Sequence, residues 1–497
     1  MSSNALAWFL FVVYLVATTI LALRGMKQTK SFSSFALGNG DLGPVLTGIT
    51  LAAAIASTAT FVINPGFVYK DGLAAFLHFG VAGYGGVILG LVTLSAGFRK
   101  LGMKHRALTL PHWMEARYGS SALRTYFALF NLLVAIAFVV LIVKGSTLVM
   151  QATLGLDYVP ALVLIVTFVF SYILLGGTYA HVYTNALQGS LMVVVAAVIF
   201  VSGLHHFSGG VSGMFEELAA IDPNLARPIN PDSTLFSSAL SVFVGGFVVS
   251  IGLVAQPHVL TKAMYLRSDR DLVPYLGVGV AVCIVYGLVL FAGFYARLEL
   301  GEGIPQDAVI PSYLAKGFPA WVGAPVAVAL LAAGMSTLDG ILVSASTIAA
   351  NDVFLGALGD RLLGDKTEEE RQNLALKASR WILIGMGLAS FAIAYDPPKL
   401  VGVFGQWGIY GLVTATFVPI VAGVVWPRFG ARAAFASAIV GPIVHFGYYG
   451  YVTLGLGQPL NPAVSATFGI VAAAVAGLLA QQPWATAKAP ASAEPAR

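Results

Sequence analysis

Two adjacent hydroxyl residues, Ser336 and Thr337, lie in the middle of a long apolar run, AAGMSTLDGILVSAST. In a helix, these hydroxyl oxygens lie beside the backbone carbonyl of Ala333. Hydroxyl and carbonyl oxygens are hard, neutral ligands that suit a bare monovalent cation. The small and hydroxyl residues of this helix would equally serve close packing against another helix. The pair therefore predicts a cation site only where further oxygens lie nearby.

Such oxygens would come from an interrupted helix in the apolar run 51–72, which contains Asn64, Pro65 and Gly66 in its middle. Proline lacks a backbone N–H and clashes with the preceding turn, so we expect the helix to break near residues 64–66. In lipid, unpaired backbone groups are tolerated only where protein, water or an ion satisfies them. The break therefore predicts either a binding site or a kink that packing absorbs.

Two charged residues fall inside apolar runs. Asp339 lies in mid-span, where a carboxylate costs at least ~2.5 kcal/mol unless it is paired, hydrated or protonated. It is either bonded to a neighbouring helix or part of an ion, water or proton pathway. Lys144 lies toward the end of its run, where its ammonium group would reach the membrane interface, which favours a structural role.

The composition identifies the class of protein. Of the 497 residues, 58% are hydrophobic and 10% are charged, and long apolar runs alternate with short polar ones. This pattern predicts an all-α polytopic membrane protein. The lone Cys283 excludes disulfides within the chain, and the net charge of +5 resides in short loops beside the spans, so no nucleic-acid partner is expected.

We expect about thirteen transmembrane helices in one domain, 1–482, followed by a disordered cytoplasmic tail, 483–497. With the N-terminus outside, 21 of the 27 lysines and arginines fall in inner loops, which supports this orientation and a cytoplasmic C-terminus in the cell (inner) membrane. The expected spans are 5–23, 44–69, 73–98, 122–150, 158–176, 180–205, 234–257, 273–296, 320–351, 375–395, 399–426, 433–455 and 463–481.

Four segments carry a resemblance to a known family: ASTATFVINPGFVY (56–69), GGTYAHVYTNALQG (176–189), AQPHVLTKAMYLRSD (255–269) and AAGMSTLDGILVSASTIAANDVF (332–354). Their order and wording resemble the sodium/solute symporter family over residues 5–480, closest to its pantothenate and short-chain monocarboxylate branches. The resemblance implies a LeuT-type fold, in which one leading helix and two trailing helices flank two inverted five-helix repeats, at about 44–205 and 234–426. The interrupted helix would then line a site at the membrane midplane.

The resemblance also implies which residues bind. Sodium would be held by the carbonyls of Ala53, Ala56 and Ala333 and the hydroxyls of Ser336 and Thr337. Gln256 belongs to a QPH segment for which structural and functional roles are equally open, since Pro257 would simply end a helix. The substrate-binding residues are expected to be Ser57, Thr60, Asn64, Gly66, Gln256, Gln406 and Trp407.

One position departs from the family pattern. Many relatives carry an aspartate in the segment that reads YTNALQG here, and some use it around a second sodium, whereas this chain has Asn185. The departure predicts a single sodium per substrate, unless Asp339 supplies a charge from another helix.

The resemblance implies sodium-coupled symport of a small organic solute into the cell. We favour a monocarboxylate or a pantothenate-like acid, and proline-like amino acids and sugars stay open. A membrane solute sensor is the alternative of another class. No enzymatic motif is present, so no catalytic residue, no cofactor and no metal other than sodium is expected. The histidines, His181, His205, His206 and His258, show no metal-ligand spacing and are expected at membrane interfaces.

Overall fold

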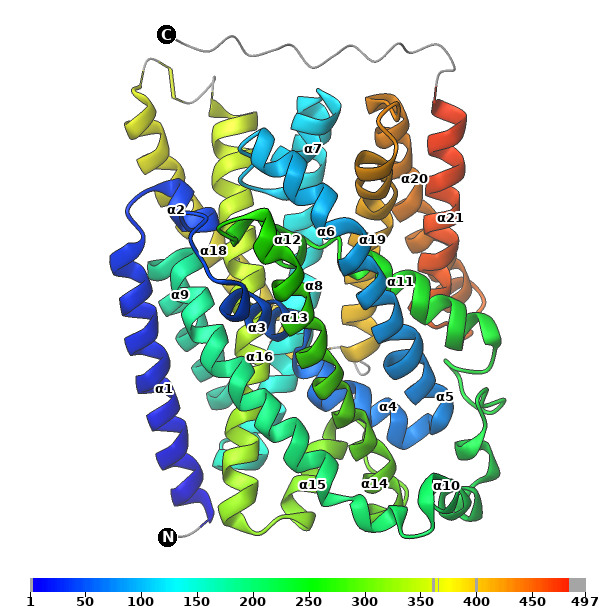
Figure 1. Ribbon diagram of the computed structural model, residues 1–497. Helices are drawn as coiled ribbons and strands as arrows, with labels where there is room; N and C mark the ends of the chain where they lie inside the picture. The colour runs from blue at the N-terminus through cyan, green and yellow to red at the C-terminus, as the bar shows by residue number, and fades with distance from the viewer. Residues whose placement is uncertain (1–2, 360–362, 365, 398–400, 482–497) are drawn as a thin grey trace.

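The computed structural model describes residues 3–359, 363–364, 366–397 and 401–481, and the tail predicted at 483–497 lies outside them. The described residues form a helical bundle without β-strands, apart from one isolated bridge between Leu42 and Leu266. Its first helix begins at one end of the bundle and α21 ends at the other, which agrees with an odd number of crossings (Figure 1).

Nine helices in the described residues are long and apolar enough to cross a membrane, or eleven if each of two bent helix pairs counts as one span. The predicted count of thirteen is therefore not confirmed. The described chain runs through α1 (Ser3–Gln28), α2 (Phe32–Leu37), α3 (Pro44–Ile55), α4 (Asn64–Asp71), α5 (Leu73–Phe76), α6 (Tyr84–Lys104), α7 (Leu110–Tyr118), α8 (Ser121–Leu154), α9 (Tyr158–Ser202), α10 (Gly210–Ile221), α11 (Gly245–Leu253), α12 (Pro257–Leu260), α13 (Leu272–Gly287), α14 (Phe291–Leu300), α15 (Val309–Gly317), α16 (Ala320–Ile348), α18 (Glu368–Tyr395), α19 (Val401–Val425), α20 (Ala431–Gly450) and α21 (Pro462–Ala480).

The first bent pair joins α3 to the segment Ala59–Asp71 at an angle of 58°. The break lies at residues 56–58 and not at the predicted 64–66, since Ala56 is extended (φ −87°, ψ 121°). Pro65 is accommodated because the π-helix η1 (Ala59–Ile63) runs directly into α4, where a wide turn leaves room for a proline ring near the start of α4. At the break itself, the backbone N–H of Ala59 donates to the Ser57 hydroxyl at 3.0 Å.

The second bent pair joins Leu240–Leu253 to Pro257–Tyr265 at 60°. Gln256 is extended at this break, and Pro257 begins the following helix rather than ending the preceding one. The two bent spans open the two predicted repeats, whose boundaries stay a prediction.

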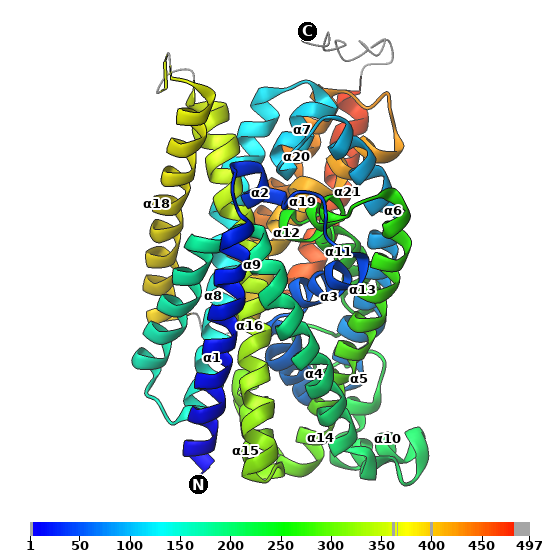
Figure 2. The same cartoon turned by 60° about the vertical axis from the view of Figure 1, so that its left-hand side comes forward.

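The long helix α9 contains a further bend at Gly177, whose φ of 57° and ψ of −153° are accessible to glycine alone. A Cβ at this position would also lie 2.5 Å from the Phe35 ring. The bend separates the predicted spans 158–176 and 180–205. The helix α16 is buried from Val326 to its end, apart from half-buried Ser344, and contacts α1, α3, α8 and α9 (Figures 1 and 2).

Candidate functional site

The break after α3 faces the Ser-Thr pair of α16. The Ser336 hydroxyl donates to the carbonyls of Ala53 and Ala333, each at 2.9 Å. The Thr337 hydroxyl lies 2.9 Å from the Ala56 carbonyl oxygen and 3.3 Å from that of Ala53. All five residues are buried, with at most 2% of their surface exposed. The structure thus gathers the five predicted oxygens into one group, called here the five-oxygen cluster.

The chemistry of the five-oxygen cluster suits a small cation. The carbonyls of Ala53 and Ala56 lie where α3 ends, and the carbonyl end of a helix carries partial negative charge. The cluster contains no carboxylate, so its charge matches a monovalent ion better than a divalent one. Oxygens 2.9–3.3 Å apart are close enough to contact one such ion together. The residues present therefore fit a sodium ion.

Asn185 contacts the backbone of a residue that belongs to the five-oxygen cluster. Its side-chain amide donates to the backbone carbonyl of Ser336 at 3.0 Å, and its Oδ1 atom has no hydrogen-bond partner among the described residues. Asn185 is fully buried and contributes no formal charge. Its observed contact fixes the backbone of α16 at the residue that carries a cluster hydroxyl.

Asp339 lies one turn further along α16 in a separate polar group. Its Oδ2 atom accepts from the Thr184 hydroxyl at 3.2 Å. Lys262 Nζ lies 2.7 Å from His181 Nε2. Lys262 falls between the predicted spans 234–257 and 273–296, and His181 was expected at a membrane interface, but both are buried inside the bundle. These contacts give Asp339 helix-bonding partners and do not place it in the five-oxygen cluster.

A cavity of about 150 Å³ lies beside the break and contains five of the seven predicted substrate residues: Ser57, Thr60, Asn64, Gln256 and Gln406. The other two face elsewhere. Gly66 packs against the backbone of Gln306, whose carbonyl oxygen would lie 2.2 Å from an added Cβ. Trp407 packs against Phe446, with ring centroids 4.9 Å apart.

His258, which was expected at a membrane interface, is buried and lines this cavity. The sequence analysis missed the other polar lining residues, namely His78, Tyr84, Ser250 and Tyr410. His78 is fully buried, and its Nδ1 atom lies 2.7 Å from the Ser241 carbonyl. A histidine inside the apolar run 73–98, near its start, was the signal that would have found it. Among the described residues, the lining contains no Asp, Glu, Lys or Arg.

Comparison with known proteins identifies the family. The model of the sodium:solute symporter family matches residues 35–441, well over half of the chain. The chain belongs to this family. It is 28% identical to the sodium/pantothenate symporter of Haemophilus influenzae over 87% of both proteins, and 26% identical to that of Escherichia coli over 88% of both. It is 24% identical to a sodium/proline symporter of Staphylococcus aureus, covering 88% of this chain and 84% of the relative.

Solved structures show that the fold is shared. A sodium-coupled sialic acid symporter in a substrate-bound outward-open state superposes with a TM-score of 0.75 at 20% identity, over 95% of this chain and 96% of the other. Mhp1, a nucleobase-cation-symport-1 transporter, gives a TM-score of 0.56 at 11% identity, over 89% and 93%. These likenesses confirm the predicted LeuT-type fold, and the family match confirms the resemblance noted from the sequence.

In this family member, Lys144 does not extend freely to an interface. Its Nζ atom forms an ion pair of 3.0 Å with Asp307 Oδ2, with 12% and 13% of the two side chains exposed. Asp307 follows Gln306, the residue that contacts Gly66. The ion pair therefore ties α8 to the segment that covers α4.

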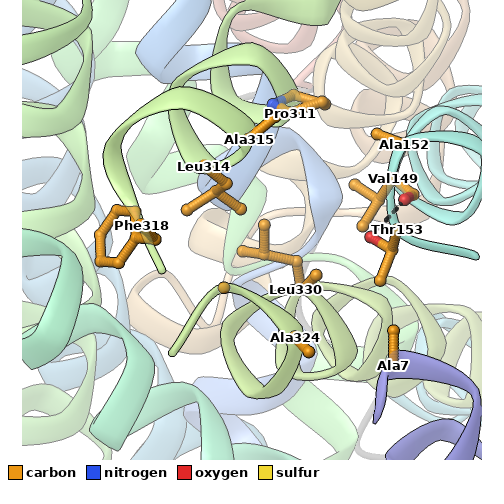
Figure 3. A pocket seen from close by; sticks show the side chains of 12 residues that line it. Ala7, Val149, Ala152, Thr153, Pro311, Leu314, Ala315, Phe318, Ala324 and Leu330 are labelled. Atoms are coloured by element: carbon orange, nitrogen blue, oxygen red, sulfur yellow. Dashed lines mark hydrogen bonds between the residues drawn. The ribbon is translucent and has the colours of Figure 1, made fainter. Parts of the chain in front are cut away.

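The symporter has a second cavity, of about 350 Å³, between α1, α8, α15 and α16 (Figure 3). Among the described residues, the side chains that line it are apolar apart from Thr153, whose hydroxyl donates to the Val149 carbonyl at 2.6 Å. None of the predicted substrate residues lies in it. The cavity that contains Ser57 and Gln406 is therefore the better candidate for the solute.

Proposed function

We propose that the chain carries a small organic acid together with one sodium ion into the cell by alternating access. The observation that supports this most is the adjacency of the five-oxygen cluster and the 150 Å³ cavity at the same helix break. Ser57 and Thr60 line the cavity, and Ala56, the residue before Ser57, contributes a carbonyl to the cluster.

The break offers opposite partial charges to the two ligands. The carbonyl end of α3 suits the cation, and the N-terminal end of the segment Ala59–Asp71 suits an anion. Discontinuous helices hold a substrate carboxylate in this way in other transporters of the LeuT type. A carboxylate in the cavity would thus be bound without an arginine or lysine. The hydroxyl and amide groups of Ser57, Thr60, Asn64 and Gln256 would orient the rest of the solute.

The names of the relatives support the same substrate class. The relatives at 28% and 26% identity are sodium/pantothenate symporters, and pantothenate is a carboxylic acid. A proline-like amino acid is the second candidate, because a sodium/proline symporter is also among the relatives and proline carries the same carboxylate. A sugar would leave the helix N-terminus without an anionic partner.

The cellular setting follows from the family and the charges. We propose an inner-membrane protein with its N-terminus outside and its C-terminus in the cytoplasm, on the distribution of basic residues. Its partners would be the lipid bilayer, sodium and the solute, with no organic cofactor. A transporter moves its solute across a sealed membrane, whereas a sensor or an enzyme need not.

Counterflow in proteoliposomes tests the proposal. Vesicles loaded with unlabelled pantothenate, short monocarboxylates, proline or sugars are diluted into a trace of the labelled compound, in sodium and in choline. We expect sodium-dependent accumulation with the acids and none in protein-free liposomes. Accumulation with sugars alone would refute the carboxylate argument, and no accumulation with any compound would favour a sensor.

A further inference from the structure

A group of metal-ligand side chains lies far from the helix breaks, at the end of the bundle where the N-terminus lies. It joins the turn η3 (Leu204–Phe207), which follows α9, to α10 and α14, and Figures 1 and 2 both place α10 and α14 at this end. His205 and His206 of the turn lie beside Glu299 of α14, and Glu217 of α10 completes the group.

We propose that His205, His206 and Glu299 bind one Zn²⁺ ion from the solution on this side of the membrane. Imidazole and carboxylate are ligands that Zn²⁺ takes in proteins, in a tetrahedron with bonds of about 2.0–2.2 Å. Such bonds separate neighbouring ligand atoms by roughly 3.4 Å. His206 Nε2 lies 3.4 Å from Glu299 Oε1, and His205 Nε2 lies 3.9 Å from the same oxygen.

The surrounding contacts hold two of these ligands in place. His206 stacks on the buried ring of Tyr295, with centroids 5.7 Å apart, and only 12% of its side chain is exposed. Gly203 leaves room for the Tyr295 ring, since a Cβ at this position would lie 2.3 Å from that ring. Lys316 donates to the backbone carbonyl of Glu299 at 3.1 Å. Most of the arrangement is therefore built by the fold.

Glu217 completes the pattern expected of a zinc-bound histidine. Its Oε2 atom lies 3.2 Å from His206 Nδ1, on the opposite side of the ring from Glu299. A carboxylate in this position fixes the tautomer that leaves Nε2 free for the metal. His205 is 63% exposed, so its ring has room to move from 3.9 Å to the roughly 3.4 Å from Glu299 Oε1 that a shared zinc ion requires. The fourth coordination position would be open to water.

A zinc ion at this site would tie the end of the last helix of the first predicted repeat to α14 of the second. Alternating access moves such parts of a transporter relative to one another. Zinc should therefore slow transport from this side of the membrane. This consequence does not depend on which solute is carried.

Zinc binding to the full-length, tag-free protein in detergent tests the proposal, measured by competition with a chromophoric chelator. We expect one zinc per chain, an affinity at least tenfold lower in His206→Ala and Glu299→Gln, and a 10- to 100-fold loss in Glu217→Gln. His105→Ala, at the end of α6, is the matched control and should bind like the wild type. Sodium-driven uptake without zinc checks that each variant is folded.

Two results would overturn the inference. Equal zinc affinity in the wild type and in both ligand variants would mean that any bound zinc lies elsewhere. Absence of zinc binding by the wild type, under conditions where uptake shows that the protein is folded, would mean that the group is a set of surface ion pairs.

Discussion

Removing one hydroxyl from the five-oxygen cluster tests the sodium site directly. Ser336→Ala and Thr337→Ala each delete one oxygen, while the carbonyls of Ala53, Ala56 and Ala333 keep their positions on the backbone. Both hydroxyls touch two of these carbonyls in the structure, at 2.9–3.3 Å, so neither is peripheral. We therefore expect the two variants to be affected to a similar degree.

The size of the effect follows from the charge of the ligand. A hydrogen bond or dipole contact to a charged group contributes about 1.5–3 kcal/mol, against about 1 kcal/mol for a neutral pair. Each 1.4 kcal/mol is a factor of about ten in an equilibrium constant. The sodium concentration for half-maximal uptake should therefore rise by about ten- to hundredfold in each alanine variant. Thr337→Ser keeps the oxygen and should remain much closer to the wild type.

The same helix provides a matched control. Ser346 and Thr347 form a second Ser-Thr pair ten residues further along, and both are buried. Their hydroxyls bond to the Val343 carbonyl of their own helix, at 2.9 and 2.8 Å. Ser346→Ala and Thr347→Ala should therefore leave the sodium dependence unchanged.

The assay is initial uptake into proteoliposomes against external sodium, at fixed membrane potential and fixed solute. Unchanged sodium dependence in Ser336→Ala and Thr337→Ala, with the proteins properly inserted, would refute the assignment. An equal shift in the control pair would show that the effect is a general loss of helix packing. In the first case, uptake driven by a pH gradient without sodium would test Asp339 as a proton carrier.

Three further predictions concern orientation, stoichiometry and an ion pair. In a variant without the native cysteine, a cysteine at Gly209 should react with an impermeant reagent from outside and one at Lys366 should not; the reverse would invalidate the topology. Because Asn185 offers no negative charge, uptake should rise hyperbolically with sodium and reversal potentials should give one sodium per solute, whereas a sigmoidal curve with a ratio of two would require a second site. Lys144→Gln and Asp307→Asn should each lower the stability of the folded protein by about 1–3 kcal/mol, because each leaves a largely buried polar group without its partner. In thermal unfolding the double variant should lose less stability than the sum of the two, and strict additivity would mean that the pair contributes nothing.

The class of all-α membrane protein could be predicted from the sequence because long apolar runs are a local signal, and the LeuT-type fold was implied by the family resemblance. The predicted count of thirteen spans is not confirmed. The bend at Gly177 falls between two predicted spans. The position of the first break could not be predicted, because proline was taken as the breaking residue. The π-helix before Pro65 absorbs the ring, and Ser57 and Thr60 supply side-chain partners for the backbone at the true break.

Some residues of the candidate site could likewise be predicted from the sequence and others could not. Ser336 and Thr337 stood out as hydroxyls in an apolar run, and the resemblance to the family supplied their partners on α3. The cavity residue His78 and the pair formed by Lys262 and His181 depend on how distant helices face one another. The metal-ligand group of His206 and Glu299 was also missed, since its members are 93 residues apart in the sequence.

The 58° break after α3 bears on how far substitutions in the solute cavity would alter the coupling between sodium binding and solute binding. If a cation and a carboxylate sit about 6 Å apart at the two helix ends, their mutual attraction is roughly 3 kcal/mol at an effective dielectric constant of 20, or about a hundredfold in affinity. The peptide groups of the two helix ends would contribute to the field that holds both ligands, beside the hydroxyls of Ser336 and Thr337. Substitutions of the side chains around Ser57 and Asn64 would then change which solute is bound, while transport would still depend on sodium. Relatives with the same backbone could therefore carry different solutes.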